Sequence, residues 1–485
     1  MLRSLMRAAG LVVSLAPALV APVVAEDWSR FRGPNGAGVS LSRGLPVEFG
    51  PGKNLDWAVE VPFGRSSPAF AGDRIFLTAT EGGRLVTLAL DRPSGKVLWR
   101  QALERSETAK LYHDNDSATP TPATDGSNVY VLFHEAGVVS YDDAGRERWR
   151  HPLGSFRNFY GVSASPVLAG DRLLVVCDQS LGSFVLALDK DTGRPLWRAD
   201  RPARRESYAT PVLYPTASTP RELLVYGSRS IDAYDVATGQ VAWTLGGVSA
   251  APVASPLLVD GLLFVAGADQ QEDPLPPFAE VATKHDTNRD SCLAGAEVEG
   301  TWMTKHFGYL DVDGNGCVSA EEWKVLDGEL GTDDWGVFGI QMGREKGPPK
   351  VLWNYRKNVS YIPSPVVYEN VFYMVKDSIV SSLDPRTGEL HKRDRLGGEK
   401  MKVYASPVAG DGKVYFAGLE GQVAVVKAGP QWEVLGVNDL DDEIYASPAI
   451  VDGHIYIRTR GRLYSFSEGS RGGAPGGGVR PLGHP

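Results

Sequence analysis

The sequence predicts an all-β fold, an eight-bladed β-propeller closed by an N-terminal strand, with a small helical pair inserted in the fifth blade. A unit of short strands recurs mostly every 41 to 45 residues, which indicates blades. A strand before the first unit can complete the last one, which indicates a closed ring. One interval of 109 residues indicates an insertion. Four strands per ~40–45 residues is typical of propeller blades.

Composition supports a repeat architecture. The chain has 485 residues, of which 42% are apolar and 22% charged, as in globular proteins. A single core rarely grows beyond about 250–300 residues, so either two domains or repeats are expected. The 55 glycines and 33 prolines indicate many turns. The net charge of −9, with no run of Lys or Arg, argues against nucleic acid and anionic membrane surfaces as partners.

The first 25 residues resemble a signal peptide. Arg3 and Arg7 form a basic start, residues 8–21 are mostly Ala, Leu and Val, and Val23-Val24-Ala25 offers small residues for cleavage. The alternative, a membrane anchor, is disfavoured because prolines and a glycine interrupt a stretch shorter than the ~20 apolar residues of a spanning helix. We therefore expect an exported protein, periplasmic or secreted, that is not integral to the membrane.

The repeat unit opens with Ser-Pro or Thr-Pro and, in its full form, continues through two alternating apolar strands, a D-x-x-x-G turn and a strand with Trp. In the turn, Asp caps its own backbone and Gly supplies a positive φ. We expect the Trp side chains to wedge between neighbouring blades. The opening prolines are Pro68, Pro122, Pro166, Pro211, Pro256, Pro365, Pro407 and Pro448. The Trp positions are Trp99, Trp149, Trp197, Trp243, Trp353 and Trp432.

Closure of the ring is predicted from the two ends of the repeats. The eighth repeat ends at residues 463–466 without its Trp strand, and residues 54–61 supply one before the first repeat. The sixth repeat has Leu390-His391-Lys392 where Trp is expected, so that blade is degenerate. A sandwich tandem, a solenoid and a seven-bladed ring are the alternatives. The propeller is expected over 26–270 and 335–468, with a disordered tail at 469–485.

The repeats also resemble a known family. Ala89-Leu-Asp91 through Trp99 and Ala187-Leu-Asp189 through Trp197 are similar to the tryptophan-docking repeats of pyrroloquinoline-quinone (PQQ) propellers. The opening Trp28-Ser-Arg-Phe-Arg-Gly-Pro-Asn-Gly36 is similar to the N-terminal stretch of exported PQQ-binding-like repeat proteins. The resemblance implies the propeller fold. It is weak for activity, because this fold hosts dehydrogenases and assembly scaffolds alike.

The insertion is expected at 271–334, after the strand 262–266 of the fifth repeat. It contains two twelve-residue segments that match the calcium loop D-x-(D/N)-x-(D/N)-G-x₅-E and resemble an EF-hand pair. Calcium prefers about seven oxygen ligands, from side chains at positions 1, 3 and 5, a carbonyl at 7 and a bidentate carboxylate at 12. The candidate ligands are Asp286, Asn288, Asp290, Cys292 and Glu297 in the first loop, and Asp311, Asp313, Asn315, Cys317, Ser319 and Glu322 in the second.

The two loops differ at position 6. Gly316 provides the sharp turn in the second loop, whereas Ser291 must adopt that conformation in the first, which therefore should bind calcium more weakly. Leu293 and Val318, at position 8, should pair as a short bridge. The expected helix faces carry Phe278 and Val281, then Trp302, Phe307 and Leu310, and finally Trp323 and Leu326.

The three cysteines exclude a disulfide scaffold. Cys177 lies in an apolar strand and is expected to be a buried core residue. Cys292 and Cys317 occupy the same position of the two loops, where a disulfide and two free thiols are equally compatible with the sequence.

Two functional hypotheses follow. The first is a non-catalytic, exported calcium-binding propeller that binds a protein or a glycan. The second is a PQQ-dependent oxidoreductase, which by resemblance would need an axial pocket with its own calcium and an aspartate base, and for which no pocket motif is found. The adjacent-cysteine pair of the alcohol dehydrogenases is absent from the sequence. Residues 112–116 (YHDND) are expected in a surface loop, with lining of the ring as the alternative.

Overall fold

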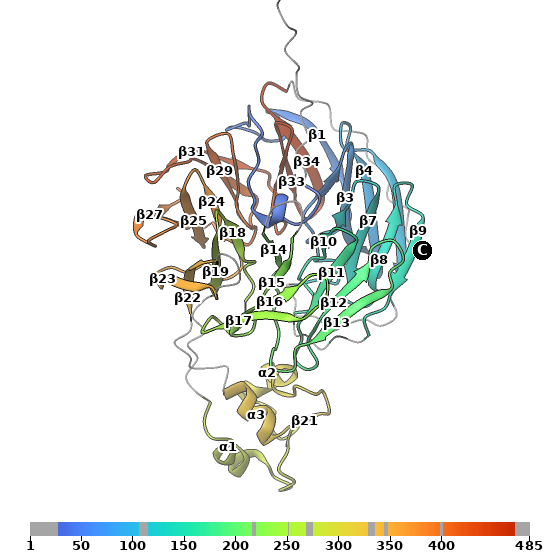
Figure 1. Ribbon diagram of the computed structural model, residues 1–485, viewed down its shortest axis with the longest axis vertical. Coiled ribbons are helices and arrows are strands. Elements are labelled where there is room, and N and C mark those ends of the chain that lie inside the picture. Colours follow the sequence, from blue (N-terminus) through green and yellow to red (C-terminus); the bar gives the residue numbers. More distant parts are fainter. Residues whose placement is uncertain are drawn as a thin grey trace, which may run out of the picture.

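The computed structural model describes residues 28–470 except 106–114, 155, 157, 159, 216–219, 251, 268–274, 328–334, 344–347 and 398–400. The predicted leader and residues 471–485 of the predicted tail lie outside the described residues. Eight four-stranded antiparallel sheets form a ring in this part of the chain (Figure 1). The predicted eight-bladed propeller is confirmed.

The blades follow the predicted repeats in order, and the first strand of each blade lies nearest the axis. Blade 1 has β2 (Ala69–Ala71), β3 (Arg74–Glu81), β4 (Arg84–Asp91) and β5 (Val97–Glu104); blade 2 has β6 (Ala123–Thr124), β7 (Asn128–Phe133), β8 (Gly137–Asp142) and β9 (Glu147–His151). Blade 3 has β10 (Val167–Ala169), β11 (Arg172–Cys177), β12 (Phe184–Asp189) and β13 (Pro195–Asp200); blade 4 has β14 (Val212–Tyr214), β15 (Glu222–Gly227), β16 (Ser230–Asp235) and β17 (Val241–Gly246).

The fifth blade contains the insertion, between its second and third strands. Blade 5 has β18 (Leu257–Val259), β19 (Leu262–Gly267), β22 (Gly336–Gln341) and β23 (Lys350–Tyr355). Blade 6 has β24 (Val366–Tyr368), β25 (Val371–Lys376), β26 (Ile379–Leu383) and β27 (Leu390–Arg395); blade 7 has β28 (Val408–Gly410), β29 (Lys413–Ala417), β30 (Gln422–Lys427) and β31 (Glu433–Asp439).

The N-terminal strand closes the ring as predicted. Blade 8 has β32 (Ala449–Val451), β33 (His454–Arg458), β34 (Arg462–Ser467) and, as its outer strand, β1 (Leu55–Glu60). Asp56 of β1 accepts hydrogen bonds from Ser467 and Ser470, and Gly469 donates to Asn54 at 3.1 Å. Gly469 and Ser470, which the sequence placed in the disordered tail, are therefore attached to the closing strand.

Tryptophan side chains join neighbouring blades, also as predicted. Five indole N–H groups donate to a backbone carbonyl in a turn of the next blade at 3.0–3.1 Å: Trp57 to Arg92, Trp99 to Asp143, Trp149 to Lys190, Trp197 to Val236, and Trp353 to Pro385. Gly95, with φ +69°, shows why glycine follows: a Cβ there would lie 2.5 Å from the ring of Trp57. The turn glycine thus supplies both the backbone angle and the room for the indole.

Two of the predicted Trp positions behave differently. Trp243 donates to Glu222 of its own blade at 3.2 Å. Trp432 precedes β31, and Gly436 takes the register position opposite Val425, so the prediction that Trp432 lies on the outer strand was wrong. Its side chain still packs in a cluster that blades 6 and 7 share. Trp432 is instead buried beneath the ammonium group of Lys392, which lies 4.4 Å from its ring centre. In the degenerate sixth blade, the usual Trp is replaced by a cation that contacts a Trp on the next blade.

The insertion forms a helical module at one edge of the ring (Figure 1). It has helices α1 (Phe278–His285), α2 (Trp302–Leu310) and α3 (Ala320–Asp327), and the strand pair β20 (Leu293–Ala294) and β21 (Cys317–Val318). Leu293 pairs with Val318, as the position-8 prediction states. Trp302, expected on a core face, is 49% exposed, while Trp323 is buried. The side chain of Leu326 lies outside the described residues. No helix in the described ranges is long and apolar enough to cross a membrane.

Candidate functional site

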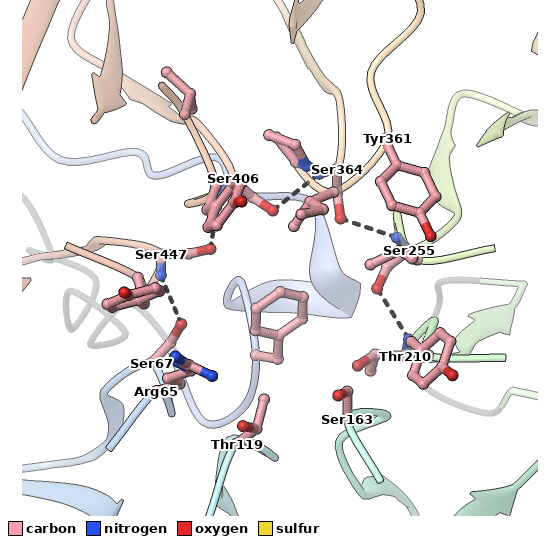
Figure 2. Close-up of a pocket in the computed structure, with 18 of the residues that line it drawn as sticks. Arg65, Ser67, Thr119, Ser163, Thr210, Ser255, Tyr361, Ser364, Ser406 and Ser447 are labelled. Carbon is pink, nitrogen blue, oxygen red and sulfur yellow. Dashed lines mark hydrogen bonds between the residues drawn. The ribbon is translucent and has the colours of Figure 1, made fainter. Parts of the chain in front are cut away.

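A closed ring of hydrogen bonds surrounds the propeller axis. In every blade, the residue before the opening proline is Ser or Thr. Its backbone N–H donates to the side-chain hydroxyl of the equivalent residue in the next blade, at 2.9–3.0 Å. The order is Ser67, Thr121, Ser165, Thr210, Ser255, Ser364, Ser406, Ser447 and back to Ser67. Figure 2 shows the part of this ring that runs from Thr210 through Ser255, Ser364, Ser406 and Ser447 to Ser67. The Ser-Pro signal therefore marks the innermost contact between blades.

A cavity of about 460 Å³ lies on one side of this hydroxyl ring. Its wall is formed largely by the residues two positions before each ring hydroxyl: Arg65, Thr119, Ser163, Tyr208, Val253, Ile362, Tyr404 and Tyr445. Tyr160 and Tyr361 add two further rings. The volume falls in the usual range of about 300–1,000 Å³ for small-molecule sites. We call this cavity the axial pocket.

The N-terminal segment closes the far end of the axis. Trp28 and Ser29 accept backbone hydrogen bonds from Phe70 and Thr124 on the first strands of blades 1 and 2. The buried guanidinium of Arg32 donates to the carbonyl of Pro365 at 2.6 Å. Between these anchors, Phe31 lines the axial pocket. The segment crosses the inside of the ring, so the pocket has a floor made by residues far from it in sequence.

Charged and aromatic side chains contact one another along one part of the pocket wall. The ammonium of Lys402 lies 4.5 Å from the centre of the Tyr404 ring, and the guanidinium of Arg65 lies 4.4 Å from that of Tyr445. The Tyr404 and Tyr445 ring centres are 6.3 Å apart. These are cation–π and aromatic contacts, which fix the orientation of the charged groups.

The charges lining the pocket are mostly positive, although the chain is acidic overall. Arg65, Lys376 and Lys402 contribute cations, and Asp377 is the one carboxylate among the described lining residues. Lys376, Asp377 and Lys402 are exposed, at the mouth. The pocket wall therefore favours anionic over cationic ligands.

Two carboxylates that do not line the pocket, Glu206 and Asp116, contact its wall from behind. Tyr208 is 7% exposed and donates to Glu206 at 3.2 Å. Burial, reinforced by the Glu206 charge, raises the pKa of Tyr208 well above its ordinary value, so its hydroxyl stays protonated. Burial also raises the pKa of the Asp116 carboxyl, while Arg65 and Arg458 act in the opposite direction. Asp116 accepts the backbone N–H of Ala118 at 2.7 Å and so shapes the segment next to the pocket.

Three carboxylates of the second predicted metal loop lie close together. Oxygens of Asp311, Asp313 and Glu322 lie within 4.8 Å of one another, and no other such group occurs in the described part of the chain. Backbone N–H groups of the loop hold them: Asn315 and Gly316 donate to Asp311 at 3.0 and 2.9 Å. Ser319 donates its hydroxyl to Glu322 at 2.8 Å. Gly316 has φ +86°, as the sharp turn requires.

The first loop is folded similarly but is less convergent. The backbone N–H of Ser291 donates to Asp286 at 3.0 Å, and Ser291 itself has φ +65°, the conformation that disfavours a side chain. The amide of Asn288 donates to Asp290 at 2.9 Å. Glu297 accepts the backbone N–H groups of Thr287 and Ala294. The five predicted ligands of this loop are thus near one another without a three-carboxylate cluster.

Cys292 and Cys317 form a disulfide. The pairing of β20 with β21 explains it, because it brings the two cysteines to a Cα–Cα distance of 5.3 Å, within the usual 4.4–6.8 Å. The bond joins position 7 of one loop to position 7 of the other. Cys177, by contrast, is a buried free thiol, as predicted.

The module touches the ring on the pocket side. The connections between second and third strands leave the ring at the same face as the pocket, where Lys376 and Asp377 line it. The module is such a connection, in blade 5. Arg205, three residues before pocket-lining Tyr208, lies with its guanidinium 5.7 Å from the ring centre of Tyr309 on α2. The loops and the pocket thus share one face.

Sequence reasoning located the two acidic loops, whose metal binding stays a prediction, and missed the pocket. Of residues 112–116, Asn115 lines the pocket and Asp116 lies behind its wall, while 112–114 are outside the described residues. The signal for the wall was present as Tyr-Ala-(Ser/Thr)-Pro, which recurs at Tyr208, Tyr404 and Tyr445. Aligning the repeats on their prolines would have shown Arg65 as the cation of that position.

Comparison with known proteins identifies the family. Residues 51–184, 135–271 and 341–471 match the family described as outer membrane protein assembly factor BamB. The matches cover more than half of the chain, which therefore belongs to this family of PQQ-like propeller repeat proteins. The inserted module falls between the second and third matches.

Curated relatives include both dehydrogenases and outer membrane protein assembly factors. Quinohemoprotein alcohol dehydrogenase ADH IIB of Pseudomonas putida is 25% identical over 40% of this chain and 31% of its own length. Outer membrane protein assembly factor BamB of Xanthomonas campestris is 25% identical over 42% of this chain and 46% of its own length. The chain thus spans less than half the length of these relatives.

Solved structures with a similar fold also include both an assembly factor and a dehydrogenase. BamB from Moraxella catarrhalis superposes with a TM-score of 0.55 at 14% identity, covering 85% of this chain and 99% of its own. Quinohemoprotein alcohol dehydrogenase from Comamonas testosteroni also gives a TM-score of 0.55, at 13% identity, covering 94% of this chain and 83% of its own. At such identity these similarities establish the fold alone.

Proposed function

We propose that the protein is an exported, calcium-binding β-propeller that acts by binding a partner molecule rather than by catalysis. The observation that carries the calcium part is the convergence of Asp311, Asp313 and Glu322 within 4.8 Å. Family membership supports the binding role and the exported location, because the family is described by an assembly factor of the outer membrane. The partner is a protein or a glycan in that compartment.

Each calcium ligand has a defined place. In the second loop, Asp311, Asp313 and Asn315 supply side-chain oxygens, Cys317 a backbone carbonyl, and Glu322 closes the shell with both oxygens, with Ser319 beside it. The equivalent groups in the first loop are Asp286, Asn288, Asp290, Cys292 and Glu297. Exported modules of this kind bind calcium at about 10⁻⁴–10⁻³ M, which suits a standing calcium supply. Calcium would then stabilise the module.

A matched pair of variants tests calcium binding. Glu322→Gln removes the closing carboxylate, whereas Glu321→Gln changes the adjacent, exposed glutamate that is not part of the carboxylate cluster. In isothermal titration with CaCl₂ we expect saturable binding by the mature chain, at least tenfold weaker binding at the second loop in E322Q, and unchanged binding in E321Q. Equal calcium affinity of E322Q and the parent chain would contradict the proposal.

The second candidate is a PQQ-dependent oxidoreductase, and the axial position of the pocket favours it. Its cations and tyrosine rings suit a planar quinone that bears carboxylates. The donor set for an accompanying metal and base does not fit: Asp377 is the sole carboxylate among the described lining residues, and it lies exposed at the mouth. We therefore assign no catalytic step to the pocket.

Titration with PQQ in calcium buffer, followed by absorbance and dye-linked alcohol oxidation, separates the two candidates. The binding-protein proposal predicts calcium binding without quinone turnover. Binding of about one quinone per chain together with turnover would overturn it in favour of the oxidoreductase.

A further inference from the structure

The two predicted calcium loops differ in how well their own residues support them. In the second loop, glycine occupies both left-handed positions, Gly314 with φ +68° and Gly316 with φ +86°. The same positions of the first loop carry Arg289 with φ +62° and Ser291 with φ +65°. Residues with a side chain rarely adopt this conformation, because the Cβ atom is then crowded by the backbone. The first loop is therefore the less stable of the two on its own.

The closing glutamates of the two loops differ in the same direction. Glu322 belongs to helix α3, so the helix holds it in place at the end of the second loop. Glu297 lies in a run of turns, and the next helix, α2, begins only at Trp302. The position of Glu297 thus depends on the first loop itself, through the backbone N–H groups of Thr287 and Ala294.

A covalent bond joins the weaker loop to the stronger one. Cys292 and Cys317, whose carbonyls are the predicted position-7 ligands, form the disulfide, and both are partly exposed. The backbone N–H of Cys292 also donates to Asp290, the position-5 ligand of its loop, at 2.8 Å. The backbone N–H of Cys317 donates to Asn315 in the same way at 2.7 Å. The disulfide therefore ties together two residues that each contact or supply ligands in their own loop.

We infer that this disulfide positions the first loop for calcium, so that the calcium affinity of that loop depends on the oxidation state of the cysteine pair. The cross-link removes conformations that the first loop must otherwise lose when it binds, and such preorganisation raises affinity. The second loop has its glycines and its helix, so its affinity depends little on the bond. The inference rests on the proposed calcium binding and assigns a regulation to it.

Reduction releases the first loop by thiol–disulfide exchange with a small dithiol. The S–S bond of the protein breaks, and its two cysteines take up two electrons and two protons to become thiols. The dithiol gives up both and closes to a cyclic disulfide. The position-7 carbonyls remain in the chain, so the chemical identity of the ligands is unchanged and only their placement is affected.

Calorimetric titration with CaCl₂, before and after reduction with dithiothreitol, tests the inference on the mature chain. With the disulfide intact we expect about two calcium ions per chain. After reduction, binding at the first loop should weaken about fivefold or more, and binding at the second loop by less than about twofold. The double variant Cys292→Ser/Cys317→Ser should give the reduced behaviour with or without dithiothreitol. Amide hydrogen exchange at saturating calcium should show α2 and α3 still protected in the reduced chain.

Glu297→Gln localises the effect, because it leaves only the second loop with its closing carboxylate. In E297Q the remaining site should keep its affinity on reduction. Glu299→Gln, which changes an exposed glutamate just outside the loop, is the matched control and should respond to reduction as the parent chain does.

Three results would overturn the inference. The first is unchanged calcium binding after reduction. The second is an equal loss at the site that remains in E297Q, which would show that the bond supports the module as a whole. The third is a single calcium ion per oxidised chain that Glu322→Gln abolishes. Absence of calcium binding by the oxidised chain would instead contradict the proposed function, and the inference with it.

Discussion

The ring and the inserted module are stabilised by different kinds of packing. In the ring, each blade shares its core with the next, so that Phe264 of blade 5 packs with Phe372 of blade 6. The module has a core of its own, in which Val281, Leu293 and Trp323 take part. The ring is therefore one cooperative body closed at its ends, whereas the module can lose its structure without opening the blades.

The largest expected effect is a loss of propeller stability caused by a substitution where the ring closes. Trp57→Ala removes the indole that packs on Gly95 and its hydrogen bond to Arg92, at a cost of about 3 kcal/mol in propeller stability. Trp302→Ala removes an indole of the module that is half exposed, and should leave the propeller transition within about 0.5 kcal/mol of the parent. Urea denaturation monitored by far-UV circular dichroism compares the two. Equal losses would mean that the module and the ring unfold together.

The second effect is confined to the module. Replacing Cys292 and Cys317 by serine opens a cross-link between residues 25 apart, which costs the module about 3 kcal/mol and leaves the ring unchanged. Amide hydrogen exchange without calcium should show faster exchange in α1–α3 and unaltered blades. Alkylation of both thiols in the untreated, native chain would contradict the disulfide itself.

The smallest expected effect is a pH-dependent change in the stability of the ring, which the module does not share. Burial alone would raise the pKa of Asp56, but hydrogen bonds from His454, Ser467, Ser470 and Ser465 lower it to about 2. Because the folded pKa lies below the ordinary value near 4, Asp56 stabilises closure above pH 4, and this contribution disappears as the pH falls through 2. After allowance for solvent screening it amounts to about 1 kcal/mol.

Asp56→Asn isolates that contribution. The difference in stability between the parent chain and D56N should be largest at neutral pH and shrink between pH 4 and 2, measured by urea denaturation of the ring. A constant difference over this range would show that the carboxylate does not hold the closing strand electrostatically.

The sequence predicted the features that repeat or that follow a complete local motif. The blade count, the closing strand and the pairing of Leu293 with Val318 all depend on spacing, which is visible in one dimension. The pocket floor is different, because Arg32 reaches Pro365 across 333 residues and no local pattern encodes that contact. The prediction that Trp432 lies on the outer strand was wrong for a related reason. A longer turn before β31 moves Trp432 out of the register position that the repeat implied.

The N-terminal segment sets the order in which the molecule can be completed. Residues 28–39 sit on blades 1, 2, 4, 6 and 7, and β1 pairs with β34, so these early residues find their places only after the last blade exists. A chain that emerges from its N-terminus must carry Phe31, Arg32 and Trp57 unpaired until synthesis ends. A chain that stops before β34 would thus lack the pairing that closes the ring, so the axial pocket is complete only in the finished ring.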